Sequence, residues 1–194
     1  MQGYYDPQPR LLLHDPLVLG GQVGAGVGLI ARVIAARTGL PFSDVDRMVE
    51  GSEGRALARI LAEDGPEVLR ERALTNLRRA LGRQPNGVIV LGSPALLQSD
   101  GAWLREHARF VYVRRSPAAL LQRIQVEHAE RDRARFPFQF GLPQCEAELQ
   151  PLLDAREPAL GEAAVVIDAG ERHPNAVARD LLDSLDRIMG VERI

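Results

Sequence analysis

The sequence contains no lysine, because all 24 of its basic residues in a chain of 194 are arginines. With one cysteine, Cys145, and only four scattered histidines, it has neither an internal disulfide nor a metal-ligand spacing of Cys and His. The net charge is −2, which gives no indication of binding to nucleic acid or to an anionic membrane. The missing lysine excludes every mechanism that needs a lysine ammonium.

The sequence also lacks segments that would direct it into a membrane. Residues 1–16, MQGYYDPQPRLLLHDP, contain no basic stretch followed by a long apolar stretch. No apolar run reaches the roughly 20 residues that span a bilayer. We therefore expect a cytoplasmic protein without a membrane partner. Apolar residues make up 45% of the chain, which is ordinary for a globular domain.

Short apolar runs alternate with helical patterns along the chain, and a strand is predicted to begin at Phe42. Four further strands are predicted at 17–19, 87–93, 109–116 and 163–170. Apolar, β-branched runs of this kind favour a parallel sheet that is covered on both faces. The predicted fold is α/β, a three-layer, doubly wound, five-stranded parallel sheet in a single domain, 14–194, after an N-terminal arm, 1–13.

The stretch LVLGGQVGAGVGLIAR, residues 17–32, has the form of a phosphate-binding loop. Gly21 and Gly26 match the glycine frame of such loops, and Gly24 lies within it. A strand precedes the loop and a helix follows it, so backbone N–H groups can surround an anion at the helix N-terminus. The alternative is a tight turn in which the glycines serve packing alone.

Two side chains that phosphate-transfer loops use are absent from this one. Val27 stands where the lysine is expected, and Gly28 stands where a Ser or Thr would ligate Mg²⁺. No lysine elsewhere can replace the missing one, and Arg32 is expected to lie too far along the helix to cap a phosphate. Losing both groups should slow phosphoryl transfer roughly 10³-fold or more.

One polar and irregular segment, 128–144, is predicted to form a lid over the site. It reads HAERDRARFPFQFGLPQ and concentrates five charged residues within 130–135. Loop statistics alone favour the alternative, a solvated connection without a role in binding.

The order of these motifs resembles the shikimate kinase family, P-loop proteins with a nucleoside-monophosphate-kinase-like fold, from about Leu17 to Met189. The resemblance implies ATP or ADP, Mg²⁺ and shikimate as ligands, and a place in aromatic amino acid biosynthesis. In the segment LPFSDVDRMVE, it implies that Asp44 helps to hold Mg²⁺ through water and that Asp46 binds the ring hydroxyls near the transferred proton. From the residues alone, the alternative is a helix N-cap at Asp44 with a solvated neighbour.

Further motifs resemble the acid-binding part of the family's site. EDGPEVLRERA places Arg70 at an arginine that grips the shikimate carboxylate, although Ala73 replaces the glutamate that follows. DAREPAL supplies a second clamp, Arg156, whose alternative is an ordinary surface arginine at a helix end. VLGS keeps only Gly92 of a run of three glycines, and the following Pro94 lacks the backbone N–H that shikimate would need.

The remaining motifs resemble the family's nucleotide contacts. LLQR places Arg123 at the arginine before the lid, and Arg135 is the candidate for the lid arginine, with Arg133 as the alternative. DAGERHPNAV resembles the adenine loop, so Arg172 would lie against the base and Pro174 would open the last helix. A guanidinium group is able to stack on a base in this way.

The sequence thus predicts a shikimate-kinase-like protein that is not an efficient kinase. It would bind a small carboxylic acid such as shikimate, a nucleotide or a protein partner in a regulatory or accessory role. Two alternatives stay open: an active small-molecule kinase that uses Arg123 and Arg135 in place of lysine, and a ligand-free protein-interaction module. ATP or ADP with Mg²⁺, held weakly, are the only cofactors implied.

Overall fold

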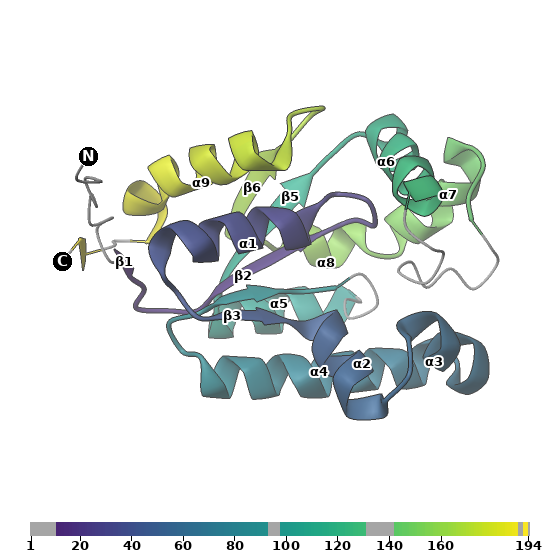
Figure 1. The fold of residues 1–194 in the computed structure, drawn as a ribbon, viewed down its shortest axis with the longest axis horizontal. Helices are drawn as coiled ribbons and strands as arrows, with labels where there is room; N and C mark the ends of the chain where they lie inside the picture. Colours follow the sequence, from purple (N-terminus) through teal and green to yellow (C-terminus); the bar gives the residue numbers. More distant parts are fainter. Residues whose placement is uncertain (1–10, 93–97, 131–141, 190–191, 194) are drawn as a thin grey trace, which may run out of the picture.

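The computed structural model describes residues 11–92, 98–130, 142–189 and 192–193. Its centre is a five-stranded parallel sheet with the strand order β3-β4-β2-β5-β6 (Figure 1). The strands are β2 (Leu17–Gly21), β3 (Phe42–Asp44), β4 (Val88–Val90), β5 (Arg109–Arg114) and β6 (Val165–Asp168). The predicted five-stranded parallel sheet is therefore confirmed.

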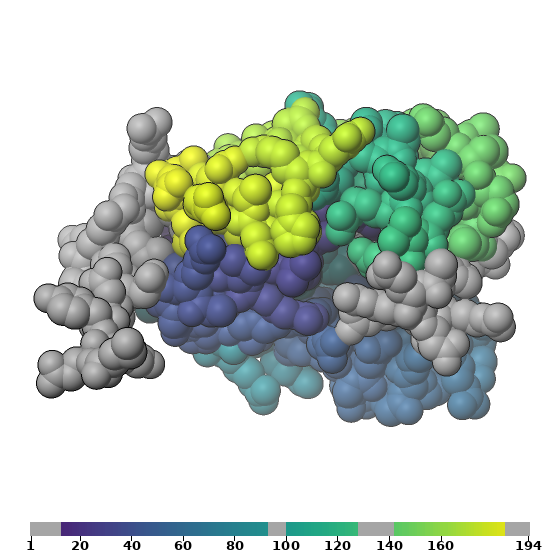
Figure 2. Space-filling model, turned by 45° about the horizontal axis from the view of Figure 1, so that its top comes forward, coloured from purple at the N-terminus to yellow at the C-terminus, as the bar shows by residue number. Residues whose placement is uncertain are grey.

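Helices cover both faces of this sheet. One face carries α1 (Val27–Thr38) and α9 (Pro174–Met189), which lie side by side (Figures 1 and 2). The opposite face carries α4 (Pro66–Arg83), α5 (Gln98–His107) and α8 (Glu157–Gly161). The remaining helices are α2 (Val45–Glu53), α3 (Leu57–Asp64), α6 (Pro117–Glu130) and α7 (Glu146–Asp154). This is the three-layer arrangement that the sequence predicted.

The central strand shows why both faces are covered. Successive strand residues point to opposite sides of a sheet, and Leu17 and Leu19 enter one hydrophobic core with Ile30 of α1. Val18, between them, enters the second core with Leu77 of α4. All five side chains are fully buried, and burying each one stabilises the fold by about 2 kcal/mol.

Two elements go beyond the sequence prediction. The apolar pattern does not reveal α2, because only Val45 and Val49 of its nine residues are buried. A short antiparallel ribbon pairs β1 (Leu11–Leu12) with β7 (Glu192–Arg193), so the end of the predicted arm lies beside the end of the chain. In the described parts of the chain, no helix is long and apolar enough to cross a membrane.

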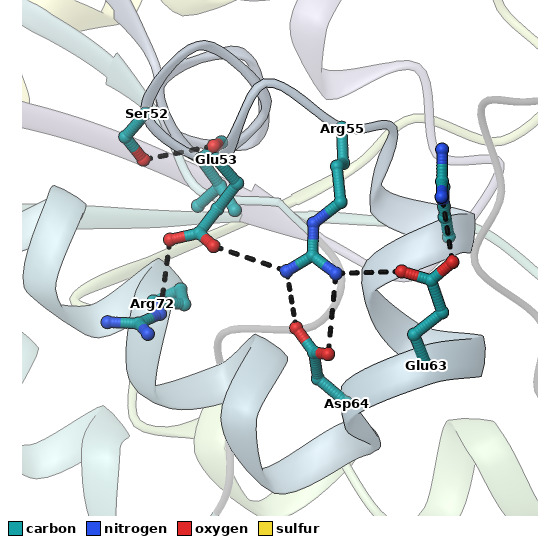
Figure 3. Close-up of polar contacts among 8 residues, drawn as sticks. Ser52, Glu53, Arg55, Glu63, Asp64 and Arg72 are labelled. Carbon is teal, nitrogen blue, oxygen red and sulfur yellow. Dashed lines mark hydrogen bonds and ion pairs between the residues drawn. The ribbon is translucent and has the colours of Figure 1, made fainter.

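Helices α2, α3 and α4 are joined by a group of ion pairs around Arg55 (Figure 3). Its guanidinium donates to Glu63 at 2.8 Å, to Glu53 at 3.4 Å and to both oxygens of Asp64. Arg72 of α4 reaches the same Glu53 at 3.1 Å. The hydrogen bonds that Arg55 donates to Asp64 and Glu63 raise the pKa of Arg55 above its ordinary value. Single exposed ion pairs contribute little, but this network connects three helices at once.

Candidate functional site

The carboxyl ends of three neighbouring strands meet at one edge of the sheet. There β2 leads into the glycine loop, β3 ends at Asp44 and β4 leads to Gly92. From β2 the chain runs to β3 and β4, which lie on one side of β2 in the strand order, and it later returns to β5 on the other side of β2. Such reversals of strand order form binding crevices in α/β folds. A cavity of about 300 Å³ opens at this edge. Its lining includes the loop residues 21–28 together with Arg32, Asp44, Asp46, Arg47, Gly92 and Arg123.

The glycine loop forms a tight turn that no other residue fits well. Gly24 and Gly26 have left-handed backbone angles, with φ of 81° and 76°. A Cβ at Gly24 would lie 2.8 Å from the carbonyl oxygen of Leu120, and one at Gly26 would lie 2.8 Å from a guanidinium nitrogen of Arg123. Gly26 is the N-cap of α1 and no side chain caps the helix. The N–H groups of the first turn, which have no helical partner, are therefore available to an anion.

The two unusual residues of the loop differ in their surroundings. Val27 is only 8% exposed and belongs to a hydrophobic core, where its Cγ2 packs over Gly21. Apart from its own turn of helix, no atom of the described residues lies within 4 Å of the position that a Cβ would take at Gly28. Val27 is therefore a packed residue of the core, whereas Gly28 leaves open space where a metal-binding hydroxyl is expected.

Arg115 is hydrogen-bonded to the glycine loop, although the sequence did not single it out. Its side chain is 4% exposed and its Nε donates to the carbonyl of Ala25 at 3.0 Å. The other guanidinium nitrogens donate to the carbonyls of Gly170 and Arg172. Burial lowers the pKa of Arg115. The signal that could have identified it is a charged residue directly after a buried central strand, where α/β sites form.

Arg123 lies against the glycine loop. Its Nε donates to the carbonyl of Gly24 at 2.8 Å, and its Nη2 lies 3.4 Å from Glu127. The arginine thus contacts the loop through backbone, and part of its charge is balanced by its own helix.

The candidate for the adenine contact has partners within the same chain, and its contact with a base stays a prediction. Arg172 is held by the carboxylate of Asp180 and by the backbone carbonyls of Asp168 and Ala169. Pro174 opens α9, as predicted. The lid candidates Arg135 and Arg133 lie outside the described residues, as does most of the predicted lid.

Asp44 is committed to two structural tasks. Its Oδ1 accepts the backbone N–H of Arg47 at 3.3 Å, which makes it the N-cap of α2. Its Oδ2 lies 3.7 Å from Arg32 Nη2 and 3.7 Å from Arg47 Nε. The N-cap interpretation is confirmed. The expectation that Arg32 lies too far along the helix to cap a phosphate stays a prediction, although Arg32 lines the same cavity as the glycine loop.

These residues do not fit the Mg²⁺ that shikimate kinases use. Two guanidinium groups already neutralise Asp44, and Gly28 brings no hydroxyl. Among the described residues, no group of three His, Cys, Asp or Glu side chains could hold a metal ion. Mg²⁺ prefers carboxylates that are free to ligate it and several oxygen donors. This geometry does not favour the predicted role of Asp44, which is to help hold Mg²⁺ through water, and that role stays a prediction.

The carboxyl of Asp46 has different surroundings from that of Asp44. Its Oδ1 is buried without a hydrogen-bond partner in the described part of the chain. A Cβ at Gly92 would lie 1.6 Å from that oxygen, so the carboxyl occupies the space that the glycine leaves. Burial raises the pKa of Asp46 to about 7, Asp44 and Glu50 add to the rise, and Arg156 opposes it. This second aspartate is therefore not the solvated neighbour of an N-cap.

Arg156 and Arg70 have different partners. Burial lowers the pKa of Arg156 to about 10, and the nearby carboxylate of Asp46 opposes that shift, so Arg156 is not an ordinary surface arginine. Arg70 Nη2 donates to both carboxylate oxygens of Asp100 at 2.7 and 2.6 Å. Neither arginine is among the described residues that line the cavity. The structure therefore brings Arg156 near Asp46 and Gly92, and it places Arg70 on a carboxylate of the same chain.

A statistical model of the shikimate kinase family matches residues 23–186. This chain belongs to the shikimate kinase family. It is 30% identical to a shikimate kinase of Chlorobaculum parvum over 185 residues, which covers 93% of this chain and 97% of the relative. It is 32% identical to one of Symbiobacterium thermophilum over 171 residues, with 87% and 95% covered.

Solved structures agree with this family member in fold. A shikimate kinase from Bacteroides thetaiotaomicron superposes with a TM-score of 0.73 at 19% identity, covering 89% of this chain and 98% of the other. A shikimate kinase from Acinetobacter baumannii, solved in complex with shikimate, gives 0.68 at 20% identity, with 93% and 94% covered. The P-loop kinase-like fold is thus shared over nearly the whole chain.

Proposed function

We propose that this member of the shikimate kinase family binds a small hydroxylated carboxylic acid such as shikimate and does not transfer phosphate efficiently. Its role would then be regulatory or accessory, in the cytoplasm. One contrast carries the proposal: Asp46 keeps a buried carboxyl beside Gly92 and near Arg156, whereas Val27 is packed into the core.

We call the part of the cavity around Asp46 and Gly92, near Arg156, its acid-binding end. This end has the groups that such a ligand needs. The carboxyl of Asp46, with a pKa of about 7, is able to donate or accept a hydrogen bond with a ligand hydroxyl at neutral pH. Arg156 supplies a planar guanidinium nearby, which suits a carboxylate. Arg70 can join only where a ligand displaces Asp100 from it. The A. baumannii shikimate kinase in complex with shikimate supports this ligand class.

We call the part of the cavity that residues 21–28 line its phosphate-binding end. This end keeps the glycine turn, but it lacks the lysine and the hydroxyl of a phosphate-transfer loop. The lysine and the hydroxyl supply most of the electrostatic stabilisation in loops of this kind, so transfer should be slower roughly 10³-fold or more. ATP or ADP would bind more weakly than to a loop that carries both groups. The glycine turn can still contribute its backbone N–H groups.

Calorimetric titration with shikimate and related cyclic acids tests the proposal. The natural protein should bind at least one of them, and Asp46→Asn and Arg156→Met should each weaken binding roughly tenfold or more. Arg37→Gln is the matched control, because Arg37 is exposed on the same molecule and does not line the cavity. Absence of binding to every acid would overturn the proposal.

A second function is favoured by one observation. A carboxylate with a pKa of about 7 beside a substrate hydroxyl is suited to act as a general base, so Asp46 fits an active kinase as well. In that case Arg123, which contacts the glycine loop, would take part of the role of lysine. Shikimate-dependent release of ADP that disappears in Asp46→Asn would favour this second function over the first.

A further inference from the structure

We propose that the phosphate-binding end of the cavity holds a phosphate group on arginine side chains, chiefly Arg32 with Arg47, and without Mg²⁺. The inference deepens the proposed function and rests on it in one respect, namely that this cavity is a ligand site. It names the groups that would replace lysine and metal in a chain that has no lysine and whose described residues offer no fitting metal site.

Arg32 is directed toward the start of α1. It follows Gly28 by four residues, so both lie on one face of the helix, about 6 Å apart along its axis. Helical side chains lean toward the N-terminus, and an arginine spans about one turn. The open space at Gly28 leaves this path clear among the described residues. Arg32 and Gly28 accordingly line the same cavity as the glycine loop.

The charges around Asp44 leave a positive excess. Two guanidinium groups share one carboxylate oxygen at 3.7 Å each, which is longer than a hydrogen bond. The side chains of Arg32 and Arg47 are 44% and 56% exposed, so their remaining N–H donors face solvent. The guanidinium of Arg32 also lies 6.0 Å from the centre of the Phe42 ring, within reach of a weak cation–π attraction.

The other carboxylates of the cavity are engaged elsewhere. Glu127 pairs with Arg123, and Glu50 accepts the backbone N–H of Leu57 at 3.2 Å. Asp46 belongs to the acid-binding end, where its raised pKa reduces its charge at neutral pH. An anion bound in this cavity therefore has the guanidinium groups of Arg32 and Arg47 available to it, beside the single carboxylate of Asp44.

The chemistry of these donors selects a phosphate group. Guanidinium forks match phosphate oxygens and form charge-assisted hydrogen bonds with them. A divalent cation at the same place would be repelled by two guanidiniums, and Asp44 is their shared counter-ion. The ligand class is therefore a phosphate-bearing anion, either free phosphate, a small phosphomonoester or a nucleotide.

The variant Asp44→Asn distinguishes this inference from a metal-dependent site, because the two predict opposite changes in the affinity for phosphate compounds. Asparagine keeps the N-cap of α2 and removes the charge that competes for Arg32 and Arg47. Binding of ADP or inorganic phosphate in EDTA should become several-fold tighter. A site that worked through Mg²⁺ would instead lose affinity, and that result would overturn the inference.

Calorimetry with inorganic phosphate, a phosphomonoester and ADP, each in EDTA and in MgCl₂, completes the test. Affinity should change less than about twofold between EDTA and MgCl₂, and Arg32→Gln should weaken binding about tenfold. Arg37→Gln, on the same helix, should have no effect. The arms show which phosphate source binds tightest.

Three results would contradict the inference: binding lost in EDTA, no effect of Arg32→Gln, or no binding of any phosphate compound. The proposed function has a separate readout, because shikimate binding depends on Asp46 and Arg156. Retained shikimate affinity in Arg32→Gln also shows that the variant is folded.

Discussion

The two ends of the cavity differ in which features of a kinase site they contain, the backbone turn at one end and the side chains at the other. At the phosphate-binding end the backbone frame persists, with Gly24 and Gly26 in their left-handed turn, while Val27 lies in the core. At the acid-binding end the side chains persist, with Asp46 buried beside Gly92. One end therefore retains its shape and the other retains its chemistry.

The difference follows from what each end contributes to folding. The glycine turn joins the central strand to α1, and Arg115 and Arg123 bind its carbonyls, so the fold itself requires the frame. Val27 stabilises the core. The buried Asp46 oxygen has no hydrogen-bond partner in the described residues and costs stability. The needs of the fold explain the first end, and the proposed acid ligand would give the second end its missing hydrogen-bond partner.

The largest expected effect is the pH dependence that Asp46 confers. A pKa raised from 3.8 to about 7 stabilises the fold fully below about pH 4, and this stabilisation is lost as the pH rises through 7. The loss amounts to about 4 kcal/mol for three pKa units. Urea unfolding should find Asp46→Asn more stable than the natural protein at pH 8 and nearly equal to it at pH 4.5. A difference that stays constant with pH would show that Asp46 is solvated.

Arg115→Met should destabilise the protein by about 3 kcal/mol, because three carbonyls lose a buried donor. ADP affinity should fall with it, since one of those carbonyls is in the glycine loop, while shikimate affinity should hold. Arg114→Met is the matched control, because Arg114 is half exposed and pairs with Asp168 at the surface. It should change stability by less than about 0.5 kcal/mol. Equal losses of stability in the two variants would show that Arg115 contributes no more to the fold than a surface arginine does.

Gly92→Ala should weaken shikimate binding roughly 100-fold, because the added methyl group displaces the carboxyl of Asp46 from its place. The glycine loop should be unaffected, so ADP affinity should not change. Gly82→Ala is the control, as no described atom lies within 4 Å of its Cβ position beyond its own helix. Calorimetry with both ligands measures the contrast, and unchanged shikimate affinity in Gly92→Ala would contradict the assignment of the acid-binding end.

The smallest effect is expected from Gly28→Ser. A serine fits the open space and should stabilise α1 by about 0.5 kcal/mol, because glycine is unfavourable inside a helix. It should not restore phosphoryl transfer, since the lysine is still missing. Gly51→Ser, in α2 with similar free space, should give a similar gain in urea unfolding. Restored transfer in Gly28→Ser would show that the phosphate-binding end lacks only a hydroxyl.

Much of the fold could be predicted because apolar patterns report burial directly. The runs at 17–19 and 109–116 became central strands, since both of their faces meet helices. Helix α2 was not predicted, because two buried valines give no helical period. Its start was nevertheless visible in Asp44, whose N-cap role depends on local geometry alone.

The site could be predicted only where one residue type serves one task. Glycines in a turn do so, and Gly24 and Gly26 lie as expected. Arginines serve many tasks, so the sequence did not show that Arg115 binds carbonyls or that Asp100 occupies Arg70. Those pairings depend on which helices the fold brings together. The assignments of Asp46 and Arg156 to ligand binding stay predictions that the experiments above test.

The most direct test of the central claim is a coupled assay of ADP release with ATP, Mg²⁺ and shikimate. The natural protein is measured beside Asp46→Asn, at shikimate concentrations that calorimetry shows to be saturating. The account predicts that shikimate binds and that both proteins release ADP at the same background rate. Shikimate-dependent ADP release in the natural protein that disappears in Asp46→Asn would contradict it.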